Sequence, residues 1–131
     1  MWTCDKQAAK LFGLNLIPGE HGDGLRGDGV IRYGGNSGYQ AVNLAYLWGA
    51  GRILLLGYDM GHNGLTHYFG DHPNGIQVNS PFKMFMKCFE TIRPKDYGIE
   101  IINCTPGSKL DCFPRMDIAK ALEHDNTRAK T

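Results

Sequence analysis

Residues 30–59 read VIRYGGNSGYQAVNLAYLWGAGRILLLGYD, and this stretch decides the fold. Residues 30–33 are predicted to be a short strand, and residues 37–48 a helix that is covered on most sides, because apolar residues fill most of positions 41–48. Residues 52–58 have a continuous aliphatic centre, which is typical of a strand buried on both faces of a parallel sheet. This order predicts two parallel strands joined by a crossover helix.

The same alternation continues on both sides of this stretch. We predict further strands at residues 14–17 and 99–103 and further helices at residues 5–12, 80–93 and 116–124. The sequence therefore predicts an α/β fold, a small Rossmann-like parallel sheet of about four strands with flanking helices. Residues 1–124 are expected to form one domain, and residues 125–131 a flexible C-terminal tail.

Two of the helices carry capping signals at their predicted starts. Ser37 is followed three residues later by Gln40, which is the spacing of a capping box. Ser80 precedes Pro81, and proline is favoured at the first helical position. These signals predict that the two helices begin at Ser37 and next to Ser80.

Composition narrows the class of protein. The 131 residues are 42% apolar and 21% charged, which fits one globular domain rather than a disordered chain. A net charge of +1 argues against a nucleic-acid partner. The longest aliphatic run, residues 53–56, is too short to span a membrane, and the first residues lack the features of a signal peptide. We expect a soluble, cytoplasmic protein without a membrane partner.

The sequence has four cysteines and no Cys-x-x-Cys spacing. We expect all four to be buried free thiols.

A ligand site is predicted at one rim of the sheet. Carboxyl ends of parallel strands and amino ends of the returning helices share a rim, and ligands of open α/β sheets bind there. The free N–H groups of a glycine-rich turn into a helix suit a phosphate or carboxylate. The predicted nucleotide-binding residues are Gly35, Asn36, Ser37, Gly38, Asp59, Asn103, Thr105 and Ser108.

Each of these assignments has a structural alternative. Ser37 would then only cap its helix, and the adjacent glycines would only permit a tight turn. Asn103, Thr105 and Ser108 would satisfy the turn that follows the last strand. The sequence leaves both interpretations open.

Residues 59–73 form the segment richest in reactive side chains, with three of the five histidines and two carboxylates. Histidine titrates near neutrality and serves as acid, base or metal ligand. His67, His72 and Asp59 are therefore the predicted catalytic residues. In the alternative, this is a solvated loop in which Tyr68 and Phe69 pack. No metal site is predicted, because no standard zinc spacing is matched by Asp59, His62, His67, Asp71 and His72.

Three motifs carry a resemblance to a known group of proteins. They are GNSGYQAVNLA at residues 35–45, GAGRILLLGYDM at residues 49–60 and HYFGDHP at residues 67–73. The chain resembles phage and prophage proteins related to the 6-hydroxymethylpterin diphosphokinase-like family and, more distantly, bacterial sialyltransferases of the family-42 type. The resemblance runs from Trp2 to Leu122. Such relatives usually carry another strand–helix section at the front, so a short or N-terminally truncated member is expected.

The resemblance implies roles for several residues. Asn36, Ser37 and Gly38 would bind the nucleotide part of a donor, with Asp59 beside it, and His67 or His72 would be the catalytic histidine. In a sialyltransferase-like reaction the histidine would deprotonate the acceptor hydroxyl while CMP leaves. In a diphosphokinase-like reaction a metal–nucleotide complex, with magnesium as the metal, would donate a pyrophosphoryl group.

The sequence therefore predicts a nucleotide- or nucleotide-sugar-binding transferase-like domain of phage origin, acting in the host cytoplasm if the phage encodes it. The alternatives are a non-catalytic module that binds or sequesters a nucleotide, and a partner-binding domain. A short sheet with exposed edges also predicts a homodimer, because unpaired edges and apolar faces need cover.

Overall fold

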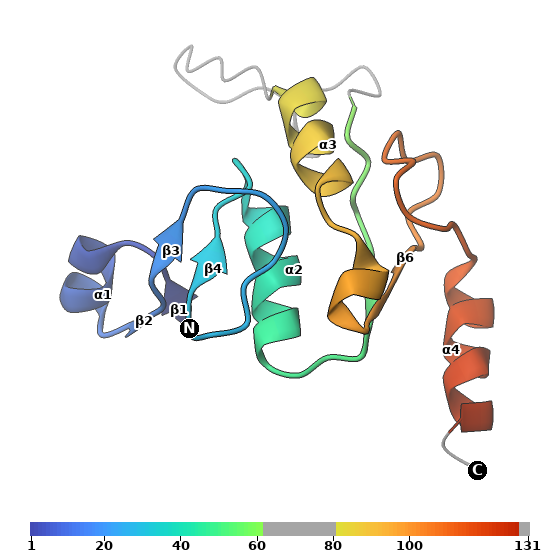
Figure 1. The fold of residues 1–131 in the computed structure, drawn as a ribbon, viewed down its shortest axis with the longest axis horizontal. Coiled ribbons are helices and arrows are strands. Elements are labelled where there is room, and N and C mark those ends of the chain that lie inside the picture. Colours follow the sequence, from blue (N-terminus) through green and yellow to red (C-terminus); the bar gives the residue numbers. More distant parts are fainter. Residues whose placement is uncertain (62–80, 129–131) are drawn as a thin grey trace. The chain divides into compact units, whose positions relative to one another are not determined.

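The computed structural model describes residues 1–61 and 81–128 (Figure 1). These residues combine helices with short strands. In chain order the elements are β1 (Trp2–Thr3), α1 (Lys6–Phe12), β2 (Asn15–Leu16), β3 (Gly19–Glu20), β4 (Ile31–Arg32), α2 (Ser37–Leu47), β5 (Arg52–Leu55), α3 (Phe82–Glu90), the 3₁₀ helix η2 (Pro94–Tyr97), β6 (Glu100–Asn103) and α4 (Ile118–Arg128).

The chain divides into two compact units. The first unit comprises Met1–Ile53 and Cys88–Glu100, and the second comprises Leu54–Lys87 and Ile101–Thr131. Among the described residues, no helix has the length and apolar content needed to cross a membrane.

The predicted single Rossmann-like sheet is wrong for the described residues, which form three separate two-stranded sheets. β1 pairs in parallel with β2, and β3 pairs in parallel with β4. β5 and β6 also run parallel, because the N–H groups of Glu100 and Cys104 bond in ascending order to the carbonyl oxygens of Gly51 and Leu55, both at 2.9 Å.

The strands of these sheets are short, and two local features border them. The aliphatic run predicted as a strand over residues 52–58 is paired only as far as Leu55. Gly57 then adopts a φ of +76°, a conformation incompatible with an extended strand. At the other end of the chain, Pro18 lies between β2 and β3 and has no N–H for a sheet ladder. At the end of β6, Asn103 forms one further parallel bridge, to Arg115, outside the named strands.

The four predicted helices are present, with shifted ends. Asp5 caps α1 by accepting a hydrogen bond from the Ala8 N–H over 2.8 Å, and Gly13 closes the helix at a φ of +62°. α3 begins at Phe82. α4 continues to Arg128, past the end expected at residue 124 and into the residues predicted to be a tail.

The core of the first unit forms around α2, which packs against β4. Tyr39 and Phe89 are both fully buried, and their ring centroids lie 5.3 Å apart. Asn43 is also fully buried on α2; its Oδ1 accepts hydrogen bonds from the N–H groups of Arg26 at 3.1 Å and Arg32 at 2.8 Å. One polar side chain therefore joins the helix to β4 and to the loop before it.

The core of the second unit lies between the end of β6 and α4. Ile102, Cys104 and Ala121 are buried together, and Met116 and Ile118 pack against them. These contacts place the start of α4 beside the turn that follows β6, which is the region that forms the cavity described below.

Candidate functional site

The glycine-rich turn before α2 is held by Asn36, which is the capping residue of the helix. Asn36 Oδ1 accepts a hydrogen bond from the Tyr39 N–H over 2.8 Å, and its Nδ2 donates to the Gly34 carbonyl over 3.0 Å. The capping box predicted at Ser37 is therefore wrong. Ser37 is the first helical residue, and Gln40 Nε2 donates instead to the Tyr33 carbonyl at 3.3 Å.

Backbone conformation and close packing explain why this turn contains glycine. Gly34 and Gly35 have φ angles of +54° and +72°. A Cβ on Gly34 would lie 2.0 Å from Cγ of Tyr39, so a side chain there would displace the buried ring. Four of the predicted ligand-binding residues, Gly35 to Gly38, thus belong to a turn of the first unit, in which the side chain of Asn36 is engaged in the turn itself.

The other four predicted binding residues meet in the second unit. Asn103 is buried at the end of β6, and its Nδ2 donates to Ser108 Oγ over 2.9 Å and to the Leu110 carbonyl over 3.1 Å. Its Oδ1 accepts from the Thr105 N–H over 3.0 Å. One side chain therefore closes the whole turn from Asn103 to Leu110.

The same turn is bonded to the chain that leaves β5. Thr105 Oγ1 accepts a hydrogen bond from the Tyr58 N–H at 2.9 Å, and Ser108 Oγ donates to the Tyr58 carbonyl at 2.5 Å. The Lys109 N–H donates to the Asp59 carbonyl over 2.9 Å, while the Asp59 side chain is exposed. Burial raises the pKa of the Tyr58 hydroxyl. Asp59, Asn103, Thr105 and Ser108 are thus brought together as predicted, but the last three use their polar side-chain atoms on one another and on the backbone.

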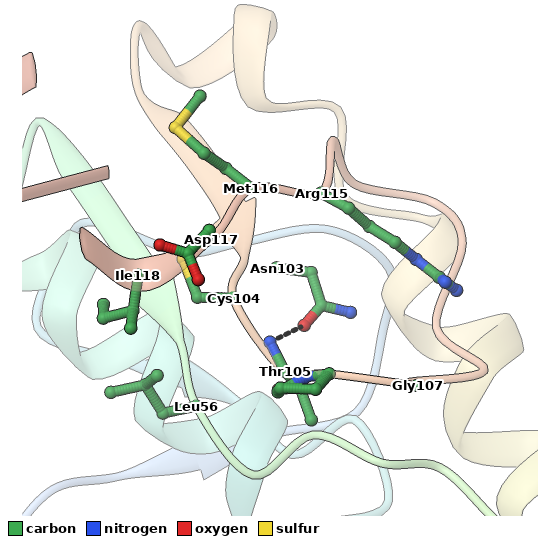
Figure 2. A pocket seen from close by; sticks show the side chains of 10 residues that line it. Leu56, Asn103, Cys104, Thr105, Gly107, Arg115, Met116, Asp117 and Ile118 are labelled. Atoms are coloured by element: carbon green, nitrogen blue, oxygen red, sulfur yellow. Dashed lines mark hydrogen bonds between the residues drawn. The ribbon is translucent and has the colours of Figure 1, made fainter. Parts of the chain in front are cut away.

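A cavity of about 470 Å³ lies against this turn (Figure 2). This volume is in the range of small-molecule sites. Backbone hydrogen bonds join its two walls, from the Asn103 N–H to the Pro114 carbonyl over 2.8 Å and from the Met116 N–H to the Asn103 carbonyl over 3.2 Å. The lining residues are Leu56, Asn103, Cys104, Thr105, Pro106, Gly107, Arg115, Met116, Asp117 and Ile118.

Two opposite charges line this cavity. The Arg115 guanidinium contacts the Ser108 carbonyl and the Asp111 carboxylate, and it retains 46% side-chain exposure. Asp117 Oδ1 accepts hydrogen bonds from the N–H groups of Ala119 at 2.9 Å and Lys120 at 3.4 Å, so Asp117 caps α4. Figure 2 shows Asp117 on one side of Asn103 and the Arg115 guanidinium on the other side. The cavity is therefore lined by one acidic side chain and by one basic side chain that is paired with Asp111.

Arg115, Met116 and Asp117 were not among the residues predicted from the sequence. A signal for Asp117 is present, because an aspartate directly before an apolar-periodic segment is a helix-start signal. Nothing in the local sequence indicates that residue 115 bridges to Asn103, since that pairing joins segments separated by a loop.

The predicted catalytic residues His67 and His72 lie outside the described residues, as do His62 and Asp71. Their roles stay predictions. Within residues 1–61 and 81–128, no group of three or more His, Cys, Asp and Glu side chains is placed to hold a metal ion. The four cysteines form no disulfide with one another, as predicted, but they are not all buried. Cys104 is buried, Cys4 and Cys88 are half-buried, and Cys112 is exposed.

No protein-family model, no curated protein and no solved structure matches this chain.

Proposed function

We propose that this chain is a nucleotide-binding domain of transferase type and that its nucleotide lies in the cavity of the second unit. One observation carries the proposal: the 470 Å³ cavity opens at the carboxyl ends of the parallel strands β5 and β6. Open α/β sheets bind ligands at this end of their strands. Leu56 follows β5 and residues 103–107 end and follow β6, so both strands contribute to the cavity wall.

The chemistry of the wall suits a nucleotide. Leu56, Met116 and Ile118 offer apolar surface to a base. Arg115 is permanently charged; its Nη2 contacts Ser108 and Asp111, and its Nε and Nη1, which have no hydrogen-bond partner among the described residues, can donate to phosphate oxygens. The buried hydrogen bonds of Asn103 hold the turn in place before any ligand arrives. A pre-formed wall spares the ligand the free-energy cost of ordering it.

The transferase part of the proposal rests on the resemblance and on the histidines. Glycosyl transfer or pyrophosphoryl transfer would use His67 or His72 together with Asp59, with magnesium on the donor in the second case. A non-catalytic nucleotide-sequestering module is the second candidate. It is favoured by the engagement of Asn103, Thr105 and Ser108 in structural hydrogen bonds, which leaves these side chains to support the wall.

A thermal-shift screen against nucleotides and nucleotide sugars, with and without magnesium, tests binding. A ligand at 100 times its Kd adds about 2.7 kcal/mol to the free energy of unfolding, which is a readable shift. We expect Arg115→Gln to weaken a nucleotide hit about tenfold or more by calorimetry, because hydrogen bonds to charged groups are the strong ones. Arg93→Gln, at an exposed arginine of the first unit, is the control and should bind as the wild type. No shift with any compound would refute the nucleotide site and favour a partner-binding domain.

Turnover separates the two candidates. A transferase should consume the donor that binds, and His67→Ala or His72→Ala should abolish consumption while leaving binding intact. His21→Ala, at an exposed histidine of the first unit, is the matched control. Binding without turnover in the wild type, across acceptors, would identify the sequestering module.

A further inference from the structure

Asp117 has one carboxylate oxygen in use and one open. Oδ1 caps α4 through the N–H groups of Ala119 and Lys120. Within the described residues, Oδ2 accepts no hydrogen bond, and the side chain is exposed at the cavity. A cap needs only one acceptor atom, so the second oxygen is an acceptor available to a ligand.

The position of this oxygen fixes which part of a nucleotide it faces. An ionised carboxylate accepts hydrogen bonds and repels phosphate. Arg115 lines the same cavity, with its guanidinium on the other side of Asn103 (Figure 2). Its Nη2 pairs with Asp111, and among the described residues its Nε and Nη1 have no partner, so these two groups are the donors available to a phosphate. A nucleotide in this cavity therefore has one favourable direction, with its phosphate toward Arg115 and its donor-bearing nucleoside toward Asp117.

We infer that Asp117 is a specificity-determining residue that selects nucleotides presenting a hydrogen-bond donor at the nucleoside end. This inference rests on the proposed nucleotide site and adds the orientation and the chemical class of its ligand. The donor is a ribose hydroxyl or the exocyclic amino group of the base. Each of these groups can donate a hydrogen bond to the open carboxylate oxygen. A charge-assisted hydrogen bond is about twice as strong as a neutral one, so its loss is measurable.

Asp117→Asn is a precise variant for this test. Asparagine keeps an oxygen for the Ala119 and Lys120 N–H groups and caps helices as well as aspartate, so α4 is retained. The second oxygen becomes an NH₂ donor, which reverses the interaction. Asp117→Ser, which also caps but has no carboxylate, is the second variant. Asp5→Asn makes the same exchange at the cap of α1 in the first unit and is the control.

The experiment is calorimetric titration of wild type and variants with matched pairs of nucleotides. One arm compares ribonucleotides with their 2′-deoxy and 3′-deoxy forms. The other compares CMP with UMP and AMP with IMP, which differ in the amino group. We expect the wild type to prefer the member with the sugar hydroxyl, or the member with the exocyclic amino group, by about tenfold or more. Asp117→Asn and Asp117→Ser should remove that preference, and Asp5→Asn should retain it. The set that responds identifies the donor as sugar hydroxyl or base amino group.

Two results would overturn the inference in distinguishable ways. If nucleotides bind the wild type and Arg115→Gln weakens them, but both Asp117 variants keep every preference, Asp117 does not select the ligand and only this inference fails. If no nucleotide binds the folded wild type, the proposed site fails and the inference fails with it.

Discussion

The buried amide of Asn103 donates a hydrogen bond to Ser108 Oγ over 2.9 Å. Ser108 Oγ in turn donates to the Tyr58 carbonyl over 2.5 Å and accepts from the Leu110 N–H over 3.1 Å. Two short polar side chains therefore fix a turn that would otherwise bury unpaired backbone groups. Because this turn is one wall of the cavity, the stability of the fold and the shape of the site depend on the same hydrogen bonds.

Asn103→Ala should lower the free energy of unfolding by about 2–4 kcal/mol, because the Thr105 N–H and the Leu110 carbonyl lose their buried partner. Urea unfolding followed by circular dichroism measures the change. Asn15→Ala, at an exposed asparagine of β2, should stay within about 0.5 kcal/mol of the wild type. A loss below about 1 kcal/mol for Asn103→Ala would mean that water replaces the amide and that the turn does not depend on it.

Gly34→Ala should be among the most damaging glycine substitutions in the first unit. The new Cβ would lie 2.0 Å from Cγ of the fully buried Tyr39, at a φ of +54°. Overpacking and the left-handed backbone together should cost about 2–4 kcal/mol. Gly29→Ala is the matched control, since Gly29 has a φ of +86° but no atom within 4 Å of its Cβ position. It should cost about 1 kcal/mol, the backbone part alone. Equal losses in urea unfolding would show that the ring moves aside freely.

The sequence predicts helices better than sheets here, for a physical reason. The apolar residues that fill positions 41–48, and the aspartates Asp5 and Asp117 directly before α1 and α4, are local signals, and α1, α2 and α4 follow them. Strand pairing depends on distant partners. Residues 52–58 have the composition of a long buried strand, yet Gly57 ends it early, and no local pattern indicates the partner of β3.

The candidate site divides in the same way. Asn103, Thr105 and Ser108 were predicted to lie together from their place after a strand, and they do. The sequence left open whether these side chains bind a ligand or form hydrogen bonds within the turn. A hydroxyl or an amide can do either, so the residue types alone do not decide between the two. Asn43 was not predicted to have any role. A lone asparagine within an apolar helix does not indicate that its side chain will form hydrogen bonds with the backbone of Arg26.

Tyr39→Phe should reveal a buried hydroxyl through its pH dependence. The Tyr39 hydroxyl donates to the Gly24 carbonyl over 2.6 Å and lies 3.3 Å from Thr91 Oγ1, so its removal should cost about 1–2 kcal/mol at pH 8. Burial, the largest cause, raises the pKa of Tyr39, which keeps the hydroxyl neutral in the folded chain.

The sign of the pH effect follows from this shift. Above about pH 10 the unfolded tyrosine ionises while the folded one does not, so the unfolded state binds fewer protons and the stability contributed by Tyr39 falls as the pH rises. Phenylalanine has no such loss. The difference in unfolding free energy between wild type and Tyr39→Phe should therefore narrow from pH 9 to pH 11 in urea titrations. A difference that widens over this range would mean that the folded state favours the phenolate.

Thiol labelling links the cysteines to the cavity. Cys112 is exposed, whereas Cys104 is only 5% exposed and lines the cavity. Labelling of the native chain with a colourless disulfide reagent should therefore begin at Cys112 and reach Cys104 last, and Cys112→Ser should remove the fast phase. Burial raises the pKa of the Cys4 thiol, which lowers its thiolate fraction and slows its reaction with the reagent.

Full labelling in urea is the control, since all four thiols should then react at similar rates. A nucleotide bound in the cavity should slow Cys104 further and leave Cys112 unchanged, because only Cys104 shares a wall with the ligand. If a nucleotide that stabilises the chain protects neither thiol, the ligand lies away from this turn, and the glycine-rich turn before α2 becomes the site to test by substitution of Ser37.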